Sequence, residues 1–228
     1  MILLQAQAVD TVSNAAESTG ELSMSLFELA VQGGVVMIIL AVLSVIAIYI
    51  FFDKFMMVRK ASKINPGFME NIKNFIHEGK VESALDACRM QTGPLARMLE
   101  KGVMRIGRPL SDINTTIENV GKQEISKLEK GLALLATISG GAPMIGFLGT
   151  VIGMIQAFYN MANAGNNIDI TLLSGGIYTA MVTTVGGLIV GIVAYFAYNI
   201  IVARIDNLVA ELETRTTEFM DILNEPAN

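Results

Sequence analysis

Hydroxyl side chains occur in two long apolar stretches of this chain, and they are the first candidates for chemistry. Thr150 lies in one stretch, and Thr179, Thr183 and Thr184 lie in the other. A threonine hydroxyl donates one hydrogen bond and accepts others. A set of such groups can pass water or protons, or can receive a polar group from another helix. These four threonines are therefore predicted to line a polar path.

Titratable groups are missing around these hydroxyls. Between Gly131 and Ala203, Asp169 is the only Asp, Glu, His, Lys or Arg, and it falls between the two stretches. Proton relays inside membranes normally use Asp, Glu or His. If the chain takes part in proton movement, a partner must therefore supply the titrating carboxylate. Helices lined with hydroxyl groups would provide a binding position for this carboxylate, because an unpaired carboxylate is energetically costly in lipid.

Small residues accompany the threonines. They let membrane helices approach closely, and one helical face of the second stretch is expected to hold Ala180, Thr184, Gly187 and Gly191. The residues predicted for helix packing are Pro143, Gly146, Gly149, Gly153, Gly187 and Gly191. On the alternative interpretation, the glycines only serve packing and each threonine bonds back to its own helix.

Membrane-spanning helices must position these residues. The chain has 228 residues, of which 52% are hydrophobic and 16% charged, whereas soluble domains carry about 25% charged residues. Three stretches exceed the roughly 20 apolar residues that a span needs. Thr150 and Thr184 fall in mid-span, so antiparallel helices would place them side by side. The predicted organisation is an N-terminal periplasmic extension (1–25), a first span (26–53), a cytoplasmic helical domain (54–131), a second span (132–162), a periplasmic turn (163–171), a third span (172–203) and a cytoplasmic C-terminal helix (204–228).

Lys and Arg are distributed unevenly, which predicts the orientation. Fourteen of the sixteen lie between Lys54 and Lys130, the other two are Arg204 and Arg215, and the first 53 residues hold none. Cytoplasmic segments next to membrane spans collect Lys and Arg. The N-terminus is therefore predicted outside the cytoplasm, with the large loop and the C-terminus inside. Residues 1–8 resemble the end of a signal peptide, although a polar extension is the simpler interpretation.

Helical spacing of apolar residues continues into the soluble segments. One stripe leads into the second span without a recognised breaker, so a single helix is expected to run from cytoplasm into lipid; it consists of Ile113, Ile117, Val120, Ile125 and Leu128. A second stripe predicts that the tail packs on the 54–131 helices; it consists of Ile205, Leu208, Leu212, Phe219 and Ile222. The expected fold is an all-α integral membrane protein with three transmembrane helices, whose cytoplasmic extensions form a bundle.

Several classes of function fit the composition poorly. Cys88 is the only cysteine and His77 the only histidine, which argues against a disulfide, a zinc cluster or a histidine triad. Cys88 is expected in the core and His77 on a solvated helix surface. No phosphate-binding loop or nucleophile motif is present in the sequence, and a net charge of −5 gives no basic footprint for nucleic acid. We therefore expect no enzyme activity, cofactor, metal or nucleic-acid partner, but contact with lipid.

Two segments resemble motifs of the ExbB/TolQ/MotA proton-channel family. They are APMIGFLGTVIGM (142–154), which is followed by Phe158, and GIYTAMVTTVGGL (176–188). The three-span layout, with the N-terminus outside and a large first cytoplasmic loop, is similar to ExbB and TolQ and differs from the four-span MotA. The resemblance covers roughly residues 26–223 and is greatest to ExbB.

This resemblance implies a pentamer in the bacterial inner membrane, with a periplasmic N-terminus and a cytoplasmic C-terminus. The pentamer would surround the single spans of an ExbD-like or TolR-like partner, each carrying one aspartate. Thr150 and Thr184 match the pore-lining threonines of the family. Thr179 stands where ExbB and TolQ members commonly have a glutamate, which places more of the proton chemistry on the partner. The partner aspartate would alternate between protonated and charged states as it faces the threonines.

The resemblance is compatible with two cellular functions. An ExbB-like chain would work with a TonB-like force transducer in the import of large, scarce nutrients such as iron chelates. A TolQ-like chain would work with a TolA-like transducer in envelope upkeep during division. A third possibility is a non-conducting scaffold that only holds a membrane complex together. A secondary transporter fits poorly, because three spans without an inverted repeat or a charged midplane site lack its usual features.

Overall fold

The structure is a computed structural model that describes residues 33–163 and 170–224. This part of the chain is helical and contains no strand. Its helices are α3 (Gly34–Ala61), α4 (Phe68–His77), α5 (Val81–Met90), α6 (Pro94–Val103), α7 (Leu110–Glu129), α8 (Leu132–Asn163) and α9 (Ile170–Asn224). The predicted all-α fold is confirmed. The expected extension 1–25 lies outside the described residues, as does most of the expected turn 163–171.

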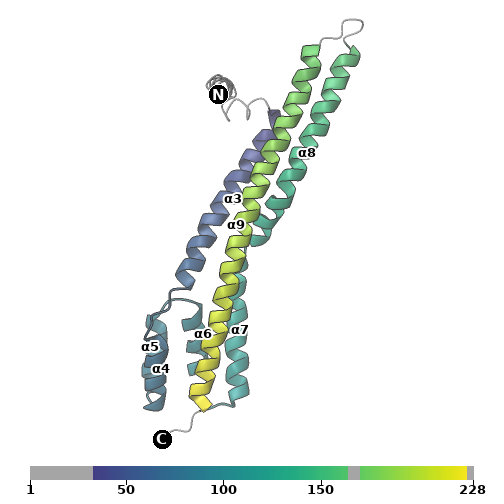
Figure 1. Ribbon diagram of the computed structural model, residues 1–228. Helices are drawn as coiled ribbons and strands as arrows, with labels where there is room; N and C mark the ends of the chain where they lie inside the picture. Colours follow the sequence, from purple (N-terminus) through teal and green to yellow (C-terminus); the bar gives the residue numbers. More distant parts are fainter. Residues whose placement is uncertain (1–32, 164–169, 225–228) are drawn as a thin grey trace, which may run out of the picture. The chain divides into compact units, whose positions relative to one another are not determined.

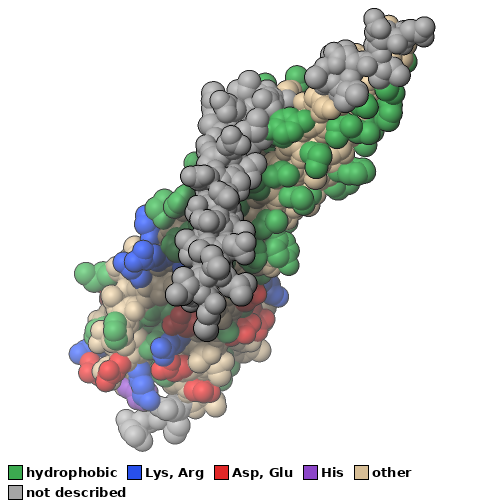
Figure 2. Space-filling model, turned by 45° about the horizontal axis from the view of Figure 1, so that its top comes forward, with side chains coloured by type: hydrophobic (Ala, Val, Ile, Leu, Met, Phe, Trp, Pro, Cys, Tyr) green, Lys and Arg blue, Asp and Glu red, His purple; other side chains and the backbone are tan. Residues whose placement is uncertain are grey.

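In the part of the chain that the structure describes, three helices are long and apolar enough to cross a membrane, and their apolar stretches lie in α3, α8 and α9. Large apolar side chains on their surfaces are uncovered, for example Val35 at 74%, Tyr49 at 71% and Phe147 at 66% exposure. Figure 2 shows hydrophobic side chains gathered along one stretch of the surface and charged ones along another. Apolar surface of this extent is unfavourable in water, and it suits helices that are surrounded by lipid or by other helices.

The described residues form two compact units: the first lies within residues 33–43, 141–163 and 170–191, and the second within residues 44–140 and 192–224. The described part of the first unit contains the N-terminal part of α3, most of α8 and the N-terminal part of α9. The second unit contains α4 to α7 and the remaining parts of the three long helices. Each long helix therefore contributes residues to both units.

The core of the second unit forms where α6, α7 and the C-terminal half of α9 meet (Figure 1). Ile117 of α7 and Phe219 of α9 are both 0% exposed. A Cβ added to Gly102 of α6 would lie 2.7 Å from Ile117 Cδ1 and 2.9 Å from Phe219 Cε1. The tail stripe expected from the sequence is buried at every position; it consists of Ile205, Leu208, Leu212, Phe219 and Ile222. The end of α9 thus packs on the soluble helices as expected.

Helices α7 and α8 are separate, so the expectation of one continuous helix into the second span is wrong. Helix α7 ends at Glu129, Lys130 has a non-helical ψ of 121°, and α8 begins at Leu132. Gly131 between them has a φ of +94°, a conformation that favours glycine because it has no Cβ. Gly131 is therefore the breaker, and the apolar spacing that crosses it did not reveal it.

Glu124 of α7 is a buried carboxylate held by two cations. The residue is 4% exposed, and its Oε1 accepts a hydrogen bond from Lys127 Nζ at 2.6 Å while its Oε2 accepts one from Arg97 Nη2 at 2.5 Å. Burial raises the pKa of Glu124, but the hydrogen bonds and positive charges of Lys127 and Arg97 outweigh burial, so the pKa lies below its ordinary value. This ion group connects α6 to α7.

We expect Glu124→Gln to lower the free energy of unfolding at neutral pH by about 1–2 kcal/mol, because an amide bonds the two cations more weakly than a carboxylate does. The folded-state pKa is depressed, so the contribution is present above the unfolded-state pKa of about 4.3 and is lost as the pH falls through the folded-state pKa. Thermal unfolding in detergent, followed from neutral to acidic pH, measures the difference. Glu118→Gln, which alters an exposed carboxylate of the same helix, is the control. A difference between wild type and Glu124→Gln that does not shrink in acid would contradict this expectation.

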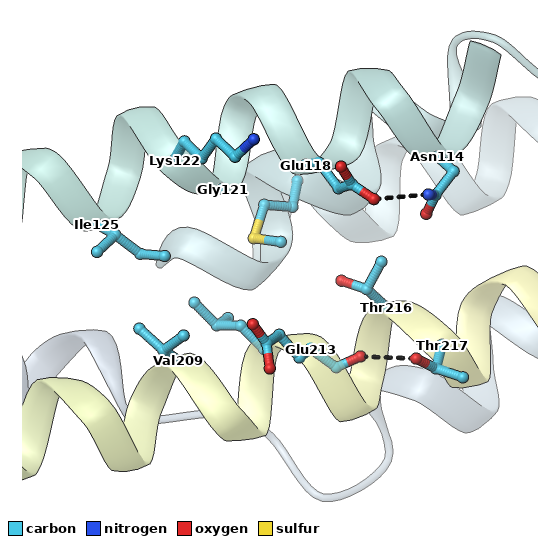
Figure 3. Close-up of a pocket in the computed structure, with 11 residues that line it drawn as sticks. Asn114, Glu118, Gly121, Lys122, Ile125, Val209, Glu213, Thr216 and Thr217 are labelled. Atoms are coloured by element: carbon cyan, nitrogen blue, oxygen red, sulfur yellow. Dashed lines mark hydrogen bonds between the residues drawn. The ribbon is translucent and has the colours of Figure 1, made fainter. Parts of the chain in front are cut away.

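A groove of about 380 Å³ lies between α7 and α9 in the second unit (Figure 3). Thr216 is 8% exposed, and its hydroxyl has no hydrogen-bond partner among the residues that the structure describes. Figure 3 shows this side chain between the two helices. The neighbouring Thr217 is different, because its hydroxyl donates to Glu213 O at 3.0 Å. Thr216 therefore carries a buried polar group that the chain itself does not satisfy.

We expect Thr216→Val to raise the free energy of unfolding by about 1 kcal/mol, because valine has the same shape and removes a buried hydroxyl without a partner. Denaturation of the purified protein in detergent measures the change. Thr217→Val is the matched control, since that hydroxyl is exposed. A Thr216→Val variant that is clearly less stable than the control would refute the expectation and would mean that the hydroxyl has a partner in the assembled protein.

Candidate functional site

The first unit is built on a very close approach of α8 to α9, which run antiparallel side by side (Figure 1). A Cβ added to Gly187 would lie 2.6 Å from Ala142 O and 2.8 Å from Gly146 Cα. A Cβ added to Gly146 would lie 2.8 Å from Thr183 O. The obstructing atoms are backbone atoms of the opposite helix, which cannot move aside as a side chain can. Glycine at 146 and 187 is therefore required for this distance between the helices.

The contact continues along both helices through other small residues. A Cβ at Gly149 would clash with the Thr183 side chain, and one at Gly153 would lie 2.9 Å from Ala180 Cβ. Further along, a Cβ at Gly176 would lie 2.6 Å from Ala157 Cβ. The small face of α8 consists of Ala142, Gly146, Gly149, Gly153 and Ala157.

The small face of α9 differs from the expected one. It consists of Gly176, Ala180, Thr183, Thr184 and Gly187, whereas the face expected from the sequence was Ala180, Thr184, Gly187 and Gly191. Thr183 is 1% exposed, and Thr184 is half-buried at the edge of the contact. The sequence analysis missed Ala157 and Gly176. The recurrence of small residues every three or four positions on both helices is the signal that could have found them.

Three of the four candidate threonines donate their hydroxyls to backbone carbonyls. Thr183 donates to Ala180 O at 2.7 Å and lies 3.4 Å from Gly146 O, and Thr184 donates to Gly146 O at 3.3 Å. Thr150 donates to Phe147 O of its own helix at 2.6 Å. No hydrogen bond joins Thr150 to Thr184 in the described part of the chain. Thr150, Thr179 and Thr184 are half-buried, so they border the helix pair and do not fill its interior.

Two other residues predicted for packing lie on the same helices. Pro143 is inside α8, where a proline lacks the N–H that would bond the carbonyl one turn earlier and so favours a kink. Gly191 is buried on α9. The structure places Pro143 three residues before Gly146, at the beginning of the close approach.

The described parts of the two threonine-bearing apolar stretches carry no carboxylate, imidazole, ammonium or guanidinium group. Residues 131–163 and 170–203 contain no Asp, Glu, His, Lys or Arg. Among the described residues, no group of three or more His, Cys, Asp or Glu side chains could hold a metal ion. The chemistry available at the helix pair is therefore hydrogen bonding by hydroxyls and carbonyls.

Cys88 and His77 lie in the second unit and are not part of this helix pair. Cys88 of α5 is buried, and burial followed by the nearby charge of Glu100 raises the pKa of its thiol to about 12. Thiols of this kind are unreactive at neutral pH. His77 is exposed in the last turn of α4.

The fold and the helix pair define the class: an all-α, multi-pass membrane protein in which the described apolar stretches of α8 and α9 offer hydroxyls without carboxylates. Comparison with known proteins then gives the family. Residues 90–214 match the MotA/TolQ/ExbB proton channel family, and the chain belongs to this family.

Relatives with two different names resemble the chain. An ExbB homologue from Methanothermobacter thermautotrophicus is 29% identical over 191 residues, which cover 83% of this chain and 67% of the relative. The biopolymer transport protein ExbB of Aquifex aeolicus is 36% identical over 104 residues, which cover 44% of this chain and 68% of the relative. The Tol-Pal system protein TolQ of Pseudomonas aeruginosa is 34% identical over 102 residues, which cover 45% of this chain and 44% of the relative. The identities therefore do not separate ExbB from TolQ.

We expect Gly187→Ala to lower the free energy of unfolding by about 1–3 kcal/mol, because the new methyl group meets the backbone of α8 and forces the helices apart. Gly175→Ala is the matched control, since a Cβ there meets no atom within 4 Å in the described residues. Thermal unfolding of both variants in detergent measures the effect. Equal melting temperatures for the two variants would show that the close approach is not required.

Proposed function

We propose that the chain is an ExbB-like subunit of an inner-membrane motor driven by the proton-motive force, which energises TonB-dependent import across the outer membrane. The observation that supports this most is the composition of α8 and the apolar part of α9. They present threonine hydroxyls but no Asp, Glu, His, Lys or Arg over residues 131–163 and 170–203. A proton pathway needs a titrating group. In this proposal a partner helix supplies that group as a carboxylate.

Thr150 and Thr184 are suited to bind a carboxyl group whether it is protonated or negatively charged. Each hydroxyl donates to a backbone carbonyl and keeps lone pairs that can accept a hydrogen bond. A protonated carboxyl can donate to such an oxygen. A carboxylate can accept a hydrogen bond from the same hydroxyl once the threonine turns about χ1. The pair therefore supports alternation of a partner aspartate between its two states, driven by about 2.3 kcal/mol per charge for each 100 mV of membrane potential.

The four candidate threonines receive different roles in this proposal. Thr150 and Thr184 line the pathway, and the half-buried Thr179 on α9 adds a further hydroxyl. Thr183, which is 1% exposed, serves mainly to pack α9 against Gly149. The glycines set the distance between the helices, and their lack of side chains lets the flanking threonines approach a third helix.

The assembly that we propose is a homopentamer around the spans of an ExbD-like partner, each span with one membrane aspartate. A TonB-like protein transmits the force. The N-terminus is periplasmic and the C-terminus cytoplasmic, because fourteen of the sixteen Lys and Arg lie between Lys54 and Lys130. Several copies are needed in this proposal, since a single α8–α9 pair encloses no channel.

Two alternatives have support of their own. The similarity to a Tol-Pal system TolQ protein at 34% identity supports a TolQ-like subunit that works with TolR-like and TolA-like partners in envelope maintenance. The bonds from Thr150 to Phe147 O and from Thr183 to Ala180 O support a non-conducting scaffold, because both hydroxyls are bonded within their own helices.

We expect the double variant Thr150→Val, Thr184→Val to reduce proton flux by about tenfold or more, because valine keeps the shape of threonine but removes the hydroxyl that meets the carboxyl group. Flux is measured with a pH-sensitive dye in proteoliposomes that contain the chain with its aspartate-bearing partner. Thr137→Val is the matched control, since Thr137 is an exposed residue of α8 whose hydroxyl also bonds its own helix, at Ala133 O.

Two outcomes would count against the proposal. Unchanged flux in the double variant, with the complex still assembled, would show that the two hydroxyls are not part of the proton pathway and would favour a chain that only holds a conducting partner in place. Steady and selective proton conduction by the chain alone would contradict the need for a partner carboxylate. Flanking reading frames for a TonB-like or a TolA-like protein would separate the ExbB-like from the TolQ-like assignment.

A further inference from the structure

A basic cavity of about 410 Å³ lies in the second unit, between the end of α3, the start of α6 and the end of α7. Lys60, Arg97 and Lys127 bring three positive charges to its lining, and Glu124 brings one negative charge. The lining therefore has a net charge of +2. These residues lie far apart in the sequence, and the packing of the three helices brings them together.

Glu124 orients two of these cations, and most of their N–H donors remain available for another ligand. Glu124 accepts one hydrogen bond from Arg97 and one from Lys127, which fixes the direction of both side chains. An arginine has five N–H donors and a lysine three, so most of them remain available. The Arg97 and Lys127 side chains are 53% and 67% exposed. Lys60 is also exposed and makes no ion pair within the described residues.

The N-terminus of α6 adds to the positive potential of the cavity. This helix begins at Pro94 after Gly93, has no acidic residue in its first turn and has no side-chain cap. The partial positive charge of a helix N-terminus is thus uncompensated here. Gly93 and Pro94 both line the cavity, so an anion in it would benefit from the helix as well as from the side chains.

The other walls of the cavity are apolar and belong to α3, which contains an apolar stretch, and to the end of α7, which is followed by α8. Met57, Ala61 and Leu128 line it, and Met56 and Met57 of α3 are 56% and 38% exposed. Lys127 precedes Leu132, where α8 begins, by five residues. The cavity lining therefore lies close in the sequence to the ends of the apolar stretches of α3 and α8, where the headgroup layer of a surrounding bilayer is located.

We propose that this cavity binds the headgroup of an anionic phospholipid of the membrane that the chain spans. The phosphate is held by Lys60, Arg97 and Lys127 beside the N-terminus of α6, and Met57 and Leu128 contact the glycerol and the first methylene groups. Basic pockets next to membrane helices are known to bind such headgroups. A zwitterionic headgroup is disfavoured, because its own cation meets a positively charged cavity.

The test is a titration of the purified full-length chain, in a neutral detergent, with dioctanoyl phosphatidylglycerol. Native mass spectrometry counts bound lipid, and thermal unfolding follows stabilisation. We expect saturable binding of phosphatidylglycerol and at least tenfold weaker binding of dioctanoyl phosphatidylcholine. The double variant Lys60→Gln, Lys127→Gln should weaken phosphatidylglycerol binding about 25-fold, since each basic residue near an anionic lipid contributes roughly fivefold in affinity.

Matched controls separate this cavity from general charge attraction. Lys101→Gln, Lys122→Gln removes the same charge from exposed positions on α6 and α7 outside the cavity lining, and it should bind as wild type does. Lys60→Arg, Lys127→Arg should retain binding, which excludes a folding defect. The proposal is overturned if the Gln variant of the cavity binds like wild type or if the control pair weakens binding equally. It is also overturned if sn-glycerol 3-phosphate, which lacks acyl chains, binds as tightly as the lipid.

Discussion

The close approach of α8 to α9 is the constraint on which the first unit depends. Lipid offers no hydrophobic driving force between two apolar helices, so they associate through close van der Waals contact and weak hydrogen bonds. At Gly146 and Gly187 the backbones are so near that a single methyl group would meet backbone atoms of the partner helix. The depth and rotation of α9 relative to α8 follow from this contact.

The same contact determines how deeply each threonine hydroxyl is buried. Thr183 is enclosed against Gly149, while Thr150 and Thr184 remain half-buried at the border of the pair. A hydroxyl at the border can reach a further helix, whereas an enclosed one cannot. Packing and the proposed proton chemistry are therefore not separate features. The glycines that allow the contact also decide which threonines are available to a partner.

Within the described residues, Asp, Glu, His, Lys and Arg are confined to the second unit, where their charges can be solvated or paired. Glu124 is buried, but two cations bond both of its carboxylate oxygens, and so its charge does not stand alone. The cations that it orients belong to the basic cavity. Residues 131–163 and 170–203 thus hold no Asp, Glu, His, Lys or Arg, and the positive charges of the basic cavity lie on α3, α6 and α7.

The sequence by itself determined the three spans, the all-α fold, the family and the buried tail stripe of α9, because transfer into lipid and helical periodicity depend on composition and spacing along one helix. The sequence analysis did not predict the break at Gly131, because the spacing of apolar residues does not reveal the backbone conformation of a glycine. The sequence pattern placed Thr184 on the packed face but omitted Thr183, which is the more buried of the two. Both residues fit a three-to-four spacing, and only contact with the second helix distinguishes them. The tertiary structure alone decided the face of α9 and the meeting of Lys60, Arg97 and Lys127, because each depends on surfaces from segments that are distant in the chain.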